Sequence, residues 1–384
     1  MKKLFKKCSP LFLILFLGLI LRLSLAYFQY SGDVGNHLVW GQGTLDGLSG
    51  FFARHFPGFN DPNYPPLTIL IFGISWRFYL FIVSIFNFLN QTIPLFPSKI
   101  IPLLGTFNMQ AVFMKLPAIL ADLGVTWLIY QLLPEKKKKL KLILASLYLF
   151  NPAVIYISTV WGQIESVTLF FLLLSLYFYF KKGNKEHLLS HLSFALACLV
   201  KQTALWLLPV YLIIWIKKKD LRLFTQGLFL QLLVFVLLYL PFTLSLIEPF
   251  RLYFSTLTVS STIIADAAWN LWSFFYPSHI SDSIHLLGIS VRYWSIILIL
   301  ISYLFVSLRL WKKVSRENIF SSLFLLSMVA FFLQTRVHER HLAPALVFLF
   351  LISYKKPWLK YVSLACLSFY HFLNLYFTLG LPFV

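Results

Sequence analysis

Long apolar stretches separated by short basic segments run along the whole chain. Eleven of these stretches are predicted to cross a membrane as helices, although several are shorter than a full span. They cover residues 11–28, 111–133, 142–158, 167–180, 188–200, 204–216, 224–243, 291–310, 319–333, 342–354 and 358–379. The pattern predicts an all-α polytopic membrane protein in which residues 1–384 form a single transmembrane domain.

A further apolar stretch, residues 67–89, follows a Pro-Pro pair and contains Arg77. If this stretch and residues 111–133 both crossed the membrane, the lysine run at 136–139 would lie outside, against the positive-inside rule. We therefore assign residues 67–89 to the membrane interface, as a juxtamembrane or re-entrant helix. It then belongs to one long outer loop, residues 29–110.

The N-terminal segment carries lysines at positions 2, 3, 6 and 7, directly before the first apolar stretch. A cleaved signal peptide is one reading of this pattern. The apolar segment, however, extends to Phe28 and contains Arg22, so we favour an uncleaved first helix. This orientation predicts a multi-pass plasma (inner) membrane protein with a cytoplasmic N-terminus and an extracytoplasmic active face.

Composition agrees with a membrane protein and excludes other classes. Only 12% of residues are charged, whereas a soluble domain has about 25%. A net charge of +20 is typical of nucleic-acid binding in soluble proteins, but here the lysines cluster in short segments between apolar stretches. The expected partner is therefore the lipid bilayer and not nucleic acid. The three cysteines are scattered and no compact set of acidic ligands is visible, so we expect no cofactor and name no metal ligands, and the requirement for a metal is left open.

The unusual polar clusters all fall on the predicted outer face. They are residues 33–37, 63–68, 161–165, 201–203, 270–272 and 336–341. Polar loops alone do not explain why acids, histidines, tryptophans and amides gather on one face while the other carries mostly lysines. This one-sided distribution predicts a binding or catalytic site on the outer face.

Asp33 is the first acid after the first predicted helix, in a chain with only 13 acidic residues. Its glycine and asparagine neighbours favour an Asx turn or a helix cap. An acid held at a membrane surface costs desolvation energy, which favours a functional role. We expect Asp33 to be the catalytic acid–base group, with Asp46 and Asp61 of the same loop as the next candidates.

Basic side chains on the outer face are candidates for binding phosphate. The segment 336–341 combines Arg, His and Glu, and it reads either as a snorkelling interfacial cluster or as a phosphate site. Lys201 and Gln202 are either an interfacial pair or contacts to an anionic head group. Gln163 and Glu165 follow a Trp-Gly pair, which is also typical of an aromatic-belt cap. No metalloprotease, P-loop, dinucleotide or nucleophile-elbow motif supports another enzyme class.

These motifs together resemble the GT-C superfamily of membrane glycosyltransferases, which use polyprenyl-phosphate sugars. The two closest branches are the dolichol-pathway glucosyltransferases and the bacterial relatives of the second mannosyltransferase of GPI-anchor synthesis. The motifs that carry the resemblance are Gly32-Asp33, Asn63-Tyr64-Pro65-Pro66-Leu67-Thr68, the segment 115–123, Asn151-Pro152, Trp161-Gly162-Gln163-Ile164-Glu165, Asn270-Leu271-Trp272 and His338-Glu339-Arg340. Asn63 stands where the dolichol enzymes have an acid, and Glu165 where many bacterial relatives have Asp.

The resemblance implies a GT-C-like bundle and an inverting transfer of mannose or glucose from a polyprenyl-phosphate donor. The acceptor would be a hydroxyl of a lipid-linked saccharide, a glycan or a protein, and Asp33 would be the general base. The expected substrate-binding residues are Arg22, His37, Tyr64, Gln163, Glu165, Lys201, Gln202, Asn270, Trp272, Arg336, His338, Glu339 and Arg340. A transporter or flippase of lipid-linked sugars is the alternative, and a non-catalytic assembly subunit is a third reading.

Overall fold

The computed structural model describes residues 9–243, 245–258, 262–353 and 357–379, and its regular structure is almost entirely helical. The first nine α-helices are α1 (Pro10–Phe28), α2 (Gly32–Gly43), α3 (Pro66–Thr92), α4 (Ile100–Leu104), α5 (Phe107–Leu132), α6 (Lys138–Leu149), α7 (Pro152–Ile155), α8 (Glu165–Phe180) and α9 (Asn184–Val200). The rest are α10 (Leu208–Ile216), α11 (Leu221–Tyr239), α12 (Glu248–Thr258), α13 (Leu271–Phe275), α14 (Val291–Lys312), α15 (Arg316–Leu333), α16 (Ala343–Ile352) and α17 (Pro357–Leu379). A two-stranded hairpin, β1 (His285–Leu286) with β2 (Ile289–Ser290), accompanies them.

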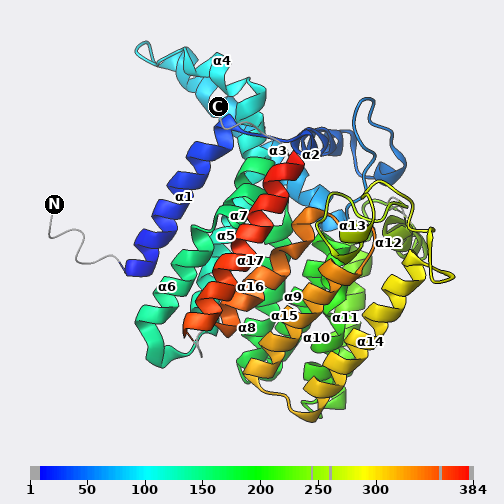
Figure 1. Cartoon of the computed structure of the whole chain (residues 1–384). Helices are drawn as coiled ribbons and strands as arrows, with labels where there is room; N and C mark the ends of the chain where they lie inside the picture. Colours follow the sequence, from blue (N-terminus) through cyan, green and yellow to red (C-terminus); the bar gives the residue numbers. More distant parts are fainter. Residues whose placement is uncertain (1–8, 244, 259–261, 354–356, 380–384) are drawn as a thin grey trace.

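The long helices lie side by side in one bundle (Figure 1). At one end of the bundle lie α2, α13 and several long connections, whereas the α5–α6 and α14–α15 connections lie at the other end. The α5–α6 and α14–α15 connections carry lysines, including Lys136 and Lys313. The expected separation of polar clusters from lysine segments is therefore seen at these two ends of the bundle, while the four N-terminal lysines lie outside the described residues.

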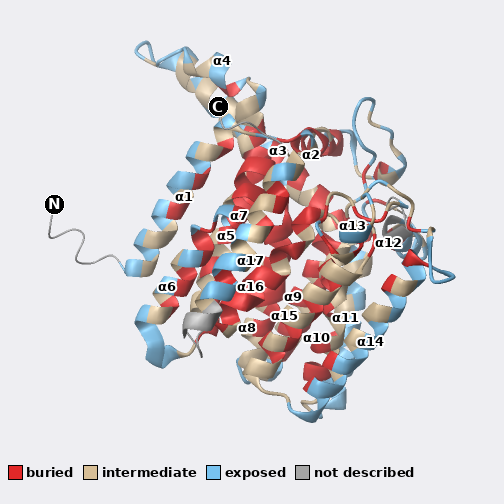
Figure 2. Cartoon of the chain, viewed as in Figure 1, coloured by how far each residue is buried: buried red, intermediate tan, exposed pale blue. Residues whose placement is uncertain are grey.

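Burial is greatest in the middle of the bundle, whereas α1, α11 and α14 present large apolar side chains at its surface (Figure 2). Examples of exposed side chains are Phe16 on α1, Phe229 on α11, and Leu304 and Phe305 on α14. An apolar surface of this extent is typical of contact with lipid. The chain is a multi-pass membrane protein, as the hydropathy pattern predicts.

The number of spans differs from the prediction. Within the described residues, seven helices are long and apolar enough to cross a membrane, or eight if the bent pair α6–α7 counts as one span. The helix α8 is shorter, and so is the segment Gln202–Ile216, so the predicted count of eleven spans is not confirmed. The helix α3 has 27 residues and qualifies by length and composition. Its predicted interfacial position stays a prediction.

The predicted helix 142–158 is broken in the structure. Pro152 has no N–H group to continue the helix, and the Asn151 side chain caps the next helix by accepting a hydrogen bond from the Ala153 N–H at 2.9 Å. The segments on either side are bent by 45°. A π-helical turn, Tyr156–Trp161, then ends at Gly162, whose φ of 86° is left-handed. This turn positions Trp161 for the contacts described below.

Candidate active site

A cavity of about 350 Å³ lies beside α2. Its walls come from α2, the α2–α3 connection, the α9–α10 connection and the segment before α16. They are Asp33, Asn36, His37, Trp40, Asn60, Asn63, Tyr64, Lys201, Gln202, Thr203, Trp206, Gln334, Arg336, His338, Arg340 and His341. Eight of the predicted site residues are thus brought to one cavity from segments more than 300 positions apart in the sequence.

Asp33 lies in the first turn of α2, not in the loop that its glycine-rich neighbourhood predicts. Ser31 precedes the helix, and its hydroxyl donates a hydrogen bond to the Trp161 carbonyl at 2.8 Å. An acid in the first turn interacts favourably with the helix dipole. Tertiary contacts to the neighbouring segment therefore support a helix that local composition disfavours.

One carboxylate oxygen of Asp33 is held by two donors. The Trp161 indole N–H donates to Oδ2 at 2.8 Å, and the Gln163 amide donates to the same oxygen. Among the described residues no hydrogen bond to Oδ1 is found. Between the two donors, Gly162 permits the close approach, because a Cβ atom there would lie 2.4 Å from Val34 Cγ2. The carboxylate is oriented through one oxygen while the other remains available.

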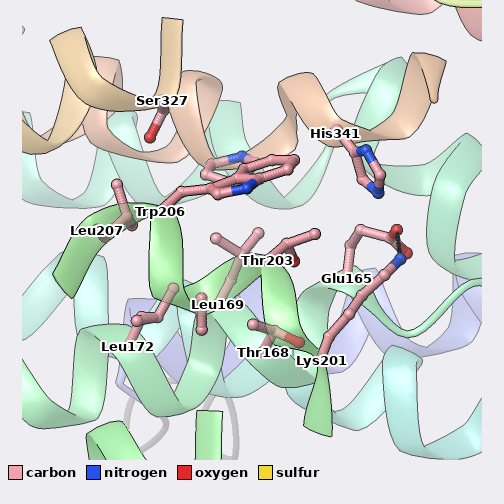
Figure 3. A pocket seen from close by; sticks show the side chains of 12 residues that line it. Glu165, Thr168, Leu169, Leu172, Lys201, Thr203, Trp206, Leu207, Ser327 and His341 are labelled. Carbon is pink, nitrogen blue, oxygen red and sulfur yellow. Dashed lines mark hydrogen bonds and ion pairs between the residues drawn. The ribbon is translucent and has the colours of Figure 1, made fainter. Parts of the chain in front are cut away.

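Lys201 and Arg340 line the cavity, and each is paired with a glutamate behind it. The Arg340 guanidinium lies 2.9 Å from Glu339 Oε1 and 3.4 Å from Glu165 Oε1, and Lys201 pairs with the same Glu165 oxygen. Figure 3 draws a neighbouring pocket that both side chains line, and it shows the Glu165 carboxylate and the Lys201 ammonium pointing toward each other, with His341 close by. Glu165 and Glu339 are buried and do not line the cavity, so they orient the cations toward it.

The electrostatics favour an ionised Asp33. Burial acts to raise the pKa of Asp33, but the charge of Arg340, the hydrogen bonds from Trp161 and Gln163, and the nearby His37 outweigh it, so the pKa is lowered. Burial lowers the pKa of His37 to about 3. Burial, with the charges of Arg340 and Lys201, lowers that of His338 to about 2. At neutral pH the cavity is lined by a carboxylate, three cations and uncharged histidines.

Four predicted site residues have other roles in the structure: Arg22, Asn270, Trp272 and Arg336. Arg22, an expected substrate-binding residue, is fully buried in the bundle and pairs with Asp122 at 3.0 Å, and it does not line the cavity. The Asn270 side chain caps α13, and the Trp272 indole donates to the Leu333 carbonyl at 2.7 Å; neither lines the cavity.

Arg336 does line the cavity, but its guanidinium makes two hydrogen bonds to Asp282, at 2.7 and 3.0 Å. Its charge is therefore directed at a protein carboxylate, which weakens its expected role in binding phosphate. Arg336 has a φ of 65°.

Several residues at the site are absent from the sequence-based prediction. Asn36 lies one turn after Asp33 on α2, a spacing that would have indicated it had the helix been recognised. Asn60 donates its backbone N–H to the Asn36 side chain at 2.9 Å, and no local signal marks it. Asp266 lies 3.4 Å from His338, so it brings a second carboxylate close to the site. Only the folded chain brings these residues together.

Within the described residues no group of three or more His, Cys, Asp or Glu side chains is placed to hold a metal ion. The expectation that no cofactor is required stays a prediction, and the requirement for a metal stays open.

Residues 88–337 match the model of glycosyltransferase family 87. The chain belongs to this family. The family is GT-C-like, so the resemblance is confirmed at the level of a membrane glycosyltransferase. The matched range begins after Asp33 and ends before His338, so the assignment of those two residues to the site rests on geometry. No curated protein matches the chain by sequence.

Proposed function

We propose that this glycosyltransferase moves a hexose, mannose or glucose, from a polyprenyl-phosphate donor to an acceptor hydroxyl with inversion at the anomeric carbon. The observation that carries the proposal is the position of Asp33. Its carboxylate, with Oδ2 anchored and Oδ1 available, lies on the wall of a cavity that Lys201 and Arg340 also line. A base and an anion site in one cavity are what this transfer requires.

In the proposed reaction the acceptor hydroxyl gives its proton to Asp33 Oδ1. The hydroxyl oxygen forms a bond to the anomeric carbon, and the bond from that carbon to the phosphate oxygen breaks with its electron pair on the phosphate. The hydroxyl becomes acidic as the new bond forms, so a carboxylate with a lowered pKa is sufficient as base. The leaving phosphate is weakly basic, and a general acid is therefore dispensable.

Arg340 and Lys201 stabilise the charge that develops on the phosphate. Their acidic partners hold them in place before the reaction, so little reorganisation is needed as the charge develops. Uncharged His338 and His341 supply hydrogen-bonding groups on the same wall. The reaction takes place on the extracytoplasmic face of the plasma membrane, with the lysine-bearing end of the bundle in the cytoplasm.

The flippase alternative receives less support. Transporters hold ionisable groups near the bilayer midplane on broken helices. The chain does hold a buried ion pair within its long helices, Arg22 with Asp122. Both side chains are fully buried and neither lines the cavity beside α2, so this pair offers no substrate path.

The direct test incubates the purified protein with radiolabelled polyprenyl-phosphate mannose or glucose and membrane extract. We expect label from one donor to appear in an extract component, and the Asp33→Asn variant to lose this transfer while still binding polyprenyl phosphate. Absence of transfer from both donors, in protein that is folded, contradicts the proposal.

A further inference from the structure

Asp33 also faces a second cavity. This cavity has a volume of about 600 Å³ and is wide open at the surface. Asp33, Asn36 and Asn60 line both cavities, so they form a wall between them. The open cavity is lined by Ser31, Gly32, Asp33, Asn36, Gly58, Phe59, Asn60, Trp161 and Leu379.

The two cavities differ in charge. Lys201, Arg336 and Arg340 line the first, whereas Asp33 is the only ionisable side chain among the described residues that line the open cavity. A phosphate prefers the cavity with the cations, because charge-assisted hydrogen bonds are stronger than neutral ones. The open cavity instead suits a neutral ligand.

The lining of the open cavity matches a carbohydrate. Phe59 is 42% exposed, and an aromatic face attracts the partly positive C–H groups of a sugar ring. The Asn36 side-chain oxygen accepts the Asn60 N–H, which leaves the Asn36 amide N–H groups to donate to a sugar hydroxyl. Within the loop, the Phe59 N–H donates to the Phe56 carbonyl at 2.9 Å. The Trp40 indole N–H donates to the Asn60 carbonyl at 2.8 Å and holds the loop against α2.

The shared wall also suits the stereochemistry of inversion. An inverting transfer brings the nucleophile to the anomeric carbon on the face opposite the leaving group, with the base beside the nucleophile. Asp33 is the one carboxylate that lines both cavities. A donor with its phosphate in the cationic cavity would place its anomeric carbon near this wall, and the acceptor would approach from the other side.

We infer that the open cavity is the acceptor site, and that the acceptor is a neutral saccharide that stacks on Phe59 and directs a hydroxyl at Asp33 Oδ1. This inference rests on the proposed transfer reaction. The saccharide is either free or attached to a lipid, and the two sources share the recognition chemistry.

The test uses methyl and hexyl glycosides of mannose, glucose and galactose as acceptor probes, with the full chain in lipid nanodiscs. Saturation-transfer NMR measures glycoside binding without turnover, and transfer assays with polyprenyl-phosphate mannose or glucose give the KM of acceptor and donor separately. In Phe59→Ala we expect glycoside affinity to fall, and acceptor KM to rise, by several-fold up to about tenfold, the usual worth of one aromatic contact. Donor KM should stay within about twofold.

Two variants control for effects on folding. Phe59→Trp keeps an aromatic face and should restore binding. Phe274→Ala removes an exposed phenylalanine on α13, away from both cavities, and should match the unmodified protein. A preference for hexyl over methyl glycosides indicates a lipid-linked acceptor, and equal binding indicates a free saccharide.

The outcomes separate the two proposals. Suppose that label moves into membrane extract but Phe59→Ala leaves glycoside binding unchanged or raises the donor KM. The assignment of the open cavity as the acceptor site is then wrong, while the proposed transfer reaction is still supported. If glycosides bind through Phe59 but no donor is used, the acceptor site stands and the proposed donor is wrong.

Discussion

The chain places acids next to bases in two very different settings. In the bundle, Asp122 accepts hydrogen bonds from Arg22 at 3.0 Å, Ser158 at 2.6 Å, Ser166 at 2.5 Å and Tyr148 at 3.2 Å. Both members of the Arg22–Asp122 pair are fully buried. Every interaction that this carboxylate needs therefore comes from the protein itself, and no ligand has a place in it.

The site beside α2 is organised differently. Asp33 is anchored through one oxygen only, and the buried Glu165 Oε2 has no hydrogen-bond partner among the described residues. Lys201 and Arg340 line a cavity although each is paired with an acid. A charged group whose interactions are all satisfied holds helices together, whereas one left partly open to a cavity is prepared for a ligand. This difference, and not the presence of charge, separates the two regions.

Replacing Asp33 with Asn should have the largest effect on catalysis. Asn keeps the size and capping ability of Asp but cannot accept the proton. A general base contributes about 10²–10⁴-fold to the rate, and transfer should fall by that factor. Donor affinity and the melting temperature in detergent should stay unchanged. Transfer at a near-normal rate contradicts the assignment and makes Asp33 a helix-terminus residue.

The same substitution in the bundle, Asp122→Asn, should act on stability. Removing one partner of a buried pair leaves the other charge unpaired, which costs about 3–5 kcal/mol. We expect a lower melting temperature, with normal turnover in the protein that remains folded. The double variant Arg22→Met with Asp122→Asn should recover part of the loss, because no buried charge is then left alone. If Asp122→Asn has normal stability but has lost activity, Asp122 takes part in the reaction and does not act only on stability.

Arg340 tests the electrostatic part of the site. Arg340→Ala should raise donor KM by about 10- to 100-fold, since hydrogen bonds to charged groups contribute about 1.5–3 kcal/mol. Arg340→Lys should lose less, because lysine keeps the charge but lacks the planar fork. Steady-state kinetics with varied donor measure both changes. Unchanged donor KM in Arg340→Ala removes this residue from the phosphate site.

The smallest expected effect is that of pH on the transfer rate. The lowered pKa of Asp33 keeps the base ionised until the pH falls below the ordinary carboxyl range, and His37, with a pKa of about 3, stays neutral. Transfer should therefore be nearly flat between about pH 8 and about pH 5, with no inflection near the ordinary histidine pKa of about 6.5. A clear inflection there would assign a titrating histidine to the reaction.

Stability should respond to the same acidification. His37 and His338 bind a proton in the unfolded chain below about pH 6.5 but stay neutral in the folded protein down to their lowered pKa values. The unfolded chain then holds more protons, so stability falls as the pH drops through this window. Melting temperature against pH, measured beside the rate, separates the two effects.

The chain's own pattern was sufficient for the class of protein. Runs such as residues 11–28 and 291–310 predicted α1 and α14 within two residues at each end. Residues from four of the six one-sided polar clusters line one cavity, whereas the clusters 161–165 and 270–272 do not line it. Hydrophobic period and charge placement are local properties, and the bilayer acts on them segment by segment.

Tertiary structure decided which polar groups meet. Arg22 finds Asp122 a hundred positions away, and Asp33 lies on a helix that its glycine-rich segment did not predict. The bend at Asn151-Pro152 and the left-handed Gly162 bring Trp161 to the carboxylate. Such pairings depend on how helices pack, and packing is set by side-chain shape across the whole bundle. The sequence shows that a charged side chain in an apolar segment needs a partner. Only the folded chain determines whether that partner is a neighbouring residue or a ligand.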